Sequence, residues 1–245
     1  MLLDPFTLAA VALLGLGAAM IGSVGGFGTG IILTAALAPL IGVKALVPVL
    51  AVAGVIINAG RFWFYRGHLD RRTFAIVLAS ALPFLVLGAW IYSVLDARTL
   101  GIVLGLVIIA SVPLRRLLKK HEIVIGPAGL GVGGGVFGLA SGVATGTGVI
   151  LISLLLGSGL AGPAVLATDA LITIALDFSK ALLFQRFDLL DGQHFLTGAV
   201  IGVASIPGSA LGAWLVHRMH AHLHVLFMEG LILAGGGFML WHSWN

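Results

Sequence analysis

Apolar residues follow one another almost without interruption from Phe6 to Trp241, and only short loops separate the runs. Several runs are close to the roughly 20 residues that an α-helix needs to cross the hydrocarbon core of a bilayer at about 1.5 Å per residue. The clearest predicted spans are residues 45–64, 74–95, 100–118, 163–184 and 195–216. The pattern predicts an all-α polytopic membrane protein.

Composition supports this class. Of the 245 residues, 60% are hydrophobic and 9% are charged, whereas a soluble domain carries roughly 25% charged residues. The 36 glycines would weaken soluble helices, but in a membrane they allow close helix packing and helix breaks. The net charge of +4 comes from basic residues in short loops, which report membrane orientation rather than nucleic-acid binding. The expected surroundings are therefore a lipid bilayer, with no nucleic-acid partner.

The sequence indicates an internal duplication, because short motifs recur at a nearly constant offset. The sequence Gly28-Thr29-Gly30 returns 118 residues later as Gly146-Thr147-Gly148. The tetrapeptide at 87–90 returns unchanged, 124 residues later, at 211–214. We therefore divide the chain into a first membrane repeat, 1–122, and a second, 123–245. Each is predicted to hold about four to five hydrophobic segments, with a glycine-rich helix break near its start.

Basic loops predict the orientation. The strongest basic cluster covers residues 115–121, and residues 66–72, two predicted spans earlier, are also basic. The positive-inside rule places both in the cytoplasm, as in a multi-pass protein of the cell (inner) membrane. The sequence does not decide whether the two halves are inverted or parallel in the membrane. If the segments around each break cross separately, each half has five spans and the halves are inverted; if they form one broken span, each has four and they are parallel.

One predicted span carries polar residues where lipid is expected. They are separated by four, four and three positions, which places them on one helix face: Asp169, Thr173, Asp177 and Lys180. A charge at mid-bilayer costs about 2.5–3.5 kcal/mol on insertion scales, so this face should meet protein or a water-filled cavity.

In the first half, Asn58 and Arg61 stand at the positions of Asp177 and Lys180. Two interpretations remain: a structural i, i+3 ion pair with both cations reaching towards an interface, or the lining of a substrate path. The second is favoured. Asp169 has no cationic partner in its own helix and is the candidate carrier of a coupling proton.

The two glycine-rich breaks form the second candidate feature. A helix that restarts inside the membrane aims free N–H groups and the positive end of its dipole into the protein, which suits an anion. Close packing through small residues is the alternative. The substrate-binding candidates at the breaks are Ser23, Gly28, Thr29 and Gly30 in the first half and Ser141, Gly146, Thr147 and Gly148 in the second.

The sequence predicts no metal and no cofactor. The histidines at 217, 220, 222 and 224 are more simply a basic interfacial loop than a metal site, because the nearest acidic residue after them is Glu229. No ATP-binding P-loop occurs. Transport would therefore be driven by an ion or substrate gradient.

The chain resembles the TauE/SafE family of sulfite and organosulfonate exporters. The resemblance rests on residues 21–30, IGSVGGFGTG, followed by the basic loop at 66–70, and on residues 140–151 in the second half. Phe27 and Thr145 interrupt the usual glycine-rich runs. The resemblance implies a secondary carrier of small sulfur-containing anions such as sulfite, thiosulfate or organosulfonates.

The leading hypothesis is therefore a secondary transporter of a small anion, working by alternating access at the interface of the two repeats, and not an enzyme. An anion channel is the first alternative. An intramembrane enzyme using Asp169 and Asp177 is less favoured, because two helical turns separate these carboxylates by about 12 Å along the axis. The glycine-rich faces would permit a homo-oligomer, but nothing favours it over packing within one chain.

Overall fold

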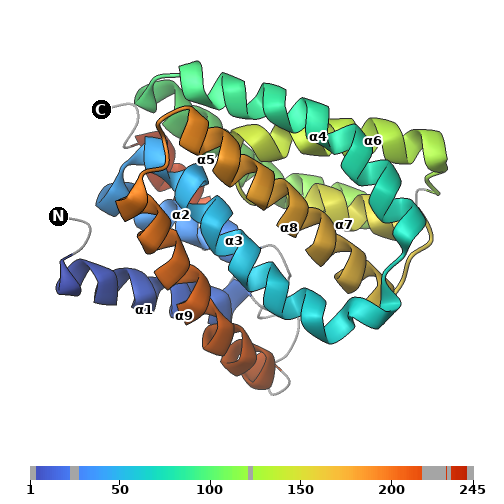
Figure 1. The fold of residues 1–245 in the computed structure, drawn as a ribbon, viewed down its shortest axis with the longest axis horizontal. Coiled ribbons are helices and arrows are strands. Elements are labelled where there is room, and N and C mark those ends of the chain that lie inside the picture. Colours follow the sequence, from blue (N-terminus) through green and yellow to red (C-terminus); the bar gives the residue numbers. More distant parts are fainter. Residues whose placement is uncertain (1–3, 23–27, 121–123, 217–229, 231–232, 242–245) are drawn as a thin grey trace.

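The computed structural model describes residues 4–22, 28–120, 124–216, 230 and 233–241. Within these ranges the chain is helical and contains no strand (Figure 1). The helices are α1 (Pro5–Gly22), α2 (Gly28–Ile41), α3 (Val43–Tyr65), α4 (Arg71–Val94), α5 (Ala97–Lys120), α6 (Pro127–Val143), α7 (Gly148–Gly157), α8 (Pro163–Arg186) and α9 (Gly192–Val216). A short 3-10 helix, Arg66–His68, follows α3, and residues 233–241 are also helical.

The predicted spans are confirmed as helices, with ends that differ by a few residues. Four helical segments of the described chain are long and apolar enough to cross a membrane: Pro5–Gly22, Val43–His68, Arg71–Val94 and Gly192–Leu211. Helix α8 has 24 residues, or about 36 Å, which is also enough, but it carries the charged stripe. The fold is that of a multi-pass all-α membrane protein.

The second glycine-rich break turns the chain back on itself. Helix α6 has 17 residues and α7 has 10, and the backbone N–H of Ile125, just before α6, donates to the carbonyl oxygen of Gly157, the last residue of α7, at 2.7 Å. The outer ends of the two helices therefore lie together. Helices α6 and α7 therefore form a helical hairpin, which is the geometry of a re-entrant segment.

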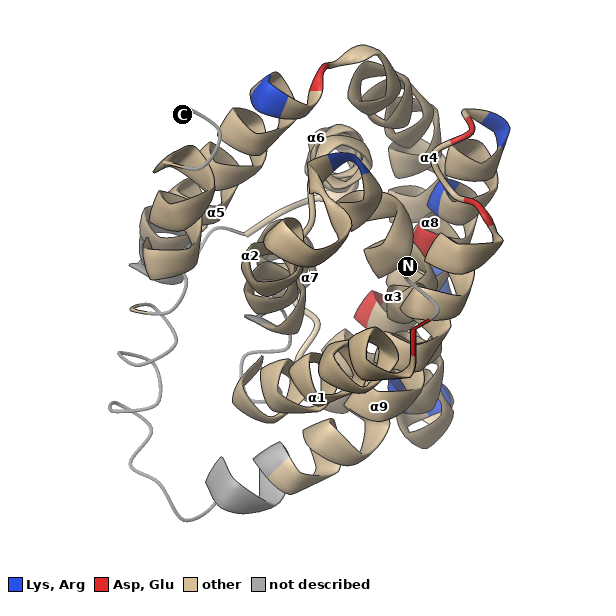
Figure 2. Cartoon of the chain, turned by 90° about the vertical axis from the view of Figure 1, so that its left-hand side faces the viewer, with Lys and Arg blue, Asp and Glu red and all other residues tan. Residues whose placement is uncertain are grey.

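Helices α1 and α2, on either side of the first break, also run in opposite directions. In Figure 1, α1 and α3 both run from left to right, and α2 returns to the left, where it is joined to α3 by the single residue Gly42. Gly42 has a φ of 79°, a left-handed conformation that favours glycine. Figure 2 shows α2 and α7 inside the bundle, with the longer helices around them.

Helices α3 and α8 form the centre and run antiparallel. Asp177, late in α8, lies against Gly54 in the middle of α3. Asp169, early in α8, pairs with Arg61, late in α3. Just beyond the end of α3, the backbone N–H of Asp70 donates to Thr168 Oγ1 at 3.2 Å. The later part of one helix thus faces the earlier part of the other.

The outer helices pack through glycine. Helix α6 presents small residues at intervals of four to α4, and the contacts advance in the same direction along both helices: Gly134 lies against Val77, Gly138 against Ala81 and Gly142 against Leu85. Such a stripe brings backbones close together, as is common in membranes. A similar close contact joins α1 to α9, where Ser205 donates to the carbonyl oxygen of Gly15 at 3.2 Å. These packings hold the hairpins against the central pair.

Candidate functional site

A polar cavity of about 150 Å³ lies where α2, α3, α6, α7 and α8 meet. Most of the sequence-predicted site residues line it: Thr29, Gly30, Asn58, Arg61, Ser141, Gly146, Thr147, Gly148, Asp169, Thr173, Asp177 and Lys180. The structure therefore brings the charged stripe of α8 and residues of both breaks to one place. Ser23 lies outside the described residues, and of Gly28 the structure describes only that it is the first residue of α2.

The charged residues of α8 are deeply buried. Asp169, Asp177 and Lys180 are 3%, 6% and 5% exposed, although each faces the cavity. Lys180 therefore does not reach towards an interface, as the structural interpretation of this stripe would require. A buried charge is tolerated only when it is paired or hydrogen-bonded, so the partners of these groups decide what the site can do.

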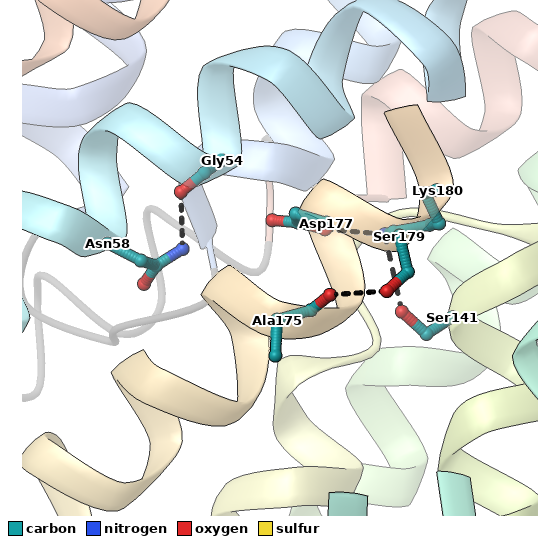
Figure 3. A network of polar contacts seen from close by, with 7 residues as sticks. All are labelled: Gly54, Asn58, Ser141, Ala175, Asp177, Ser179 and Lys180. Atoms are coloured by element: carbon teal, nitrogen blue, oxygen red, sulfur yellow. Dashed lines mark hydrogen bonds and ion pairs between the residues drawn. The ribbon is translucent and has the colours of Figure 1, made fainter. Parts of the chain in front are cut away.

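Each buried carboxylate has a cationic partner. Lys180 Nζ lies 2.7 Å from Asp177 Oδ1 and 3.3 Å from Ser141 Oγ on α6 (Figure 3). Asp169, which has no partner in its own helix, forms an ion pair with Arg61 of α3. One pair thus lies within α8 and the other joins α3 to α8. The formal charges of the described cavity lining, two positive and two negative, sum to zero.

Asn58 does not join this network of charges. Its side-chain amide donates to the carbonyl oxygen of Gly54, one turn earlier in the same helix, at 2.9 Å (Figure 3). Gly54 in turn leaves room for Asp177, because a Cβ at position 54 would collide with that carboxylate. The absence of a side chain at Gly54 is therefore what lets the Asp177 carboxylate pack against α3.

The first half of α2 contacts the turn before α7 directly, beside the cavity. A Cβ built on Gly30 would lie 3.7 Å from the backbone N of Gly146, and the hydroxyls of Thr34 and Thr145 are hydrogen-bonded to one another. Gly146 has a φ of 80°, so the turn into α7 uses a conformation that other residues rarely adopt. Sequence reasoning named Thr145 only as an interruption of the second glycine-rich run and did not name Thr34, whose hydroxyl also donates to the carbonyl oxygen of Gly30 in its own helix.

The start of α7 suits a negative charge. Its N-cap residue, Thr147, makes no side-chain capping bond, and both Thr147 and Gly148 line the cavity. The first N–H groups of a helix have no partner within the helix, and they lie at the positive end of its dipole. Backbone donors, hydroxyls and two cations thus converge on one small space.

The cavity is closed towards the end of α8. Phe184, one turn after Lys180, is fully buried and packs on Tyr92 of α4, with ring centroids 5.2 Å apart. The Tyr92 hydroxyl donates to the carbonyl oxygen of Val43 at 2.9 Å, which fixes it to the start of α3. At the other end of the cavity the Arg61 side chain is 21% exposed. Exposure therefore rises towards the end of the molecule that carries the basic loop at 66–72.

The described part of the chain contains no group of three or more His, Cys, Asp or Glu side chains that could hold a metal ion. The histidines at 217, 220, 222 and 224 lie outside the described residues. The described lining of the cavity offers groups for hydrogen bonding, ion pairing and proton transfer.

A re-entrant helix hairpin around a polar cavity, enclosed by apolar helices, is the architecture of a membrane transport protein. The sequence model of the TauE/SafE sulfite exporter family matches residues 11–239, nearly the whole chain, so this protein belongs to that family. Membership confirms the resemblance seen in the sequence and makes the chain a transporter of the sulfite and sulfur-anion class. No curated protein and no solved structure matches the chain.

Proposed function

We propose that this protein is a secondary transporter of a small sulfur-containing oxyanion in the cell (inner) membrane. It would work by alternating access at a site between its two halves. The observation that carries the proposal is the cavity itself, which is lined by the two buried ion pairs and by both helix breaks. An oxyanion of the size of sulfite needs several convergent donors, and this lining offers backbone N–H groups, hydroxyls and cations together.

The directions of the helices support two inverted halves. Helices α3 and α8 hold corresponding places in the proposed duplication and run antiparallel. A re-entrant hairpin followed by three spans is an odd number of crossings, so a second copy begins on the opposite side of the membrane. Inverted repeats around a site near the membrane midplane are a common design of secondary carriers. Rocking of one half against the other would then expose the cavity to each side in turn.

Transport should be tested in proteoliposomes by counterflow. Vesicles loaded with unlabelled sulfite, thiosulfate or a small sulfonate should accumulate the labelled anion from outside, because a carrier exchanges substrate across the membrane. An anion channel, the alternative, gives flux without counterflow. Absence of counterflow with every one of these anions would refute the proposal. A bound anion at 100 times its dissociation constant should also stabilise the purified protein by about 2.7 kcal/mol.

The role of the Lys180 cation needs a paired substitution. Removing Lys180 alone would leave the Asp177 carboxylate buried without its partner, which costs about 3–5 kcal/mol. A loss of transport in such a variant would not distinguish a folding defect from a transport defect. The variant Lys180→Met with Asp177→Asn removes both charges at nearly constant size. We expect it to fold but to lose counterflow. Lys44→Met, at an exposed position at the start of α3, is the matched control and should transport normally.

A further inference from the structure

The described lining of the cavity has no net formal charge before any substrate enters. Four charged side chains line it: Arg61 from α3, and Asp169, Asp177 and Lys180 from α8. The other described elements that line it, α2, α6 and α7 with the turn before α7, contribute hydroxyls, backbone groups and apolar side chains but no charged side chain. Both cations are already matched by carboxylates. An anion entering this space would add an unmatched negative charge, and burial of such a charge is strongly unfavourable.

A positive charge must therefore enter together with the anion or already be free for it. The described lining holds no spare cation, so a proton is the simplest source of the missing charge. We propose that the anion binds with protons, one for each of its negative charges, and that the Asp177 carboxylate accepts the first of them. This inference rests on the proposed transport function and adds the coupling ion.

Protons and charges balance when the anion binds. A proton adds to the carboxylate of Asp177, which becomes a neutral acid, and the Lys180 ammonium keeps its charge. The anion then replaces the carboxylate as the counter-ion of Lys180. A monoanion with one proton leaves the cavity neutral, and a dianion requires a second proton, which Asp169 can accept. The transported complex carries no net charge in either case.

Geometry favours Asp177 over Asp169 as the first acceptor. Lys180 is a compact charge already directed at the cavity, between Asp177 on its own helix and Ser141 of α6. Release of Asp177 would leave that ammonium beside the Ser141 hydroxyl, in a cavity that the start of α7 also lines. Arg61, by contrast, has a planar group with five N–H donors, which can hold Asp169 and an anion at the same time. Arg61 therefore has no need to release its carboxylate first.

The test is whether a membrane potential drives transport. A potential of 100 mV, set with potassium and valinomycin, shifts the distribution of a carrier complex with one net charge about 50-fold. We expect labelled sulfite uptake into proteoliposomes to be unaffected by this potential. A pH gradient, acid outside, should drive uptake, with a fall in internal pH reported by a trapped dye. Protein-free vesicles correct for sulfur dioxide that crosses the lipid directly.

Substitution of Asp177 identifies the acceptor. In Asp177→Asn the anion can still pair with Lys180, but no proton is taken up at position 177. Net sulfite uptake, compared with whatever counterflow this variant retains, should therefore become sensitive to the potential. Asp177→Glu keeps a carboxyl group and should remain insensitive. Asp191→Asn, at an exposed position just before α9, is the control for an acidic residue outside the cavity.

The outcomes are separable. If the wild-type protein shows counterflow but its net uptake follows the potential, the proton proposal is overturned and the transport function stands. If Asp177→Asn exchanges sulfite and stays insensitive to the potential, Asp177 is not the acceptor. If Asp177→Asn does not fold, the wild-type response to the potential still decides whether the transported complex is neutral. Loss of all counterflow in the wild-type protein would instead refute the transport function itself.

Discussion

The packing of α6 against α4 predicts opposite effects for two glycine-to-alanine substitutions on the same helix. A Cβ on Gly142 would lie 2.6 Å from the carbonyl oxygen of Leu85 and 2.7 Å from the backbone N of Ala89. Both atoms belong to the backbone of α4 and cannot rotate away, so the helices must move apart. A Cβ on Gly131, about one turn from the other end of α6, would meet nothing within 4 Å.

The magnitudes follow from these distances. Overpacking of a tight contact costs typically about 1–3 kcal/mol, so Gly142→Ala should be destabilising by that amount. Gly131→Ala creates no clash and reduces the conformational freedom of the unfolded chain, which should stabilise by about 0.5–1 kcal/mol. In a chain of this length 1 kcal/mol moves the unfolding temperature by roughly 2–4 °C. The two variants should therefore differ in sign as well as in size.

Thermal unfolding of the purified protein in detergent measures this difference. Gly142→Ala should also reduce sulfite counterflow per folded molecule, because the neighbouring residue, Ser141, accepts a hydrogen bond from Lys180 in the cavity. Gly131→Ala should exchange sulfite at the wild-type rate. An unfolding temperature for Gly142→Ala equal to or above that of the wild-type protein would refute the close packing of α4 and α6 described above.

Two further predictions concern the ends of the helices. Asp70 caps α4 by accepting the backbone N–H of Thr73 at 2.7 Å, so Asp70→Ala should cost about 0.5–2 kcal/mol. That hydrogen bond holds the pKa of Asp70 below its ordinary value of 3.8. The stabilisation should therefore be complete above about pH 4 and be lost as the pH falls through the folded-state pKa. The unfolding curves of the wild-type protein and of Asp70→Ala should then converge in acid. The chain has no cysteine, so a single introduced cysteine reports the side of the membrane on which it lies. A membrane-impermeant maleimide should label Ala97→Cys on intact cells and His68→Cys only after permeabilisation. The reverse pattern would contradict the positive-inside assignment.

Local periodicity was sufficient to predict the helices and one face of the site. The span predicted at 163–184 is α8, and its four polar residues line one cavity because their spacing fits a helical turn. The re-entrant hairpin could not be predicted in the same way. Residues 148–157 are as apolar as a spanning segment, and only the contact between Ile125 and Gly157 reveals that the chain returns. That contact joins residues more than 30 positions apart, which periodicity does not report.

The pairing of the charges depends on this return of the chain. Under the proposed duplication, Arg61 corresponds to Lys180, so parallel halves would place the two cations at the same depth and leave Asp169 level with Leu50. In the structure α3 and α8 run antiparallel instead, and Arg61 near the end of α3 meets Asp169 near the start of α8. The same reversal aligns Asp177 with Gly54, whose missing side chain makes room for the carboxylate. The direction in which the chain leaves each glycine-rich break therefore determines which charged residues face each other, although these residues lie 20 or more positions further along the chain. It thereby also determines the electrostatic balance of the cavity.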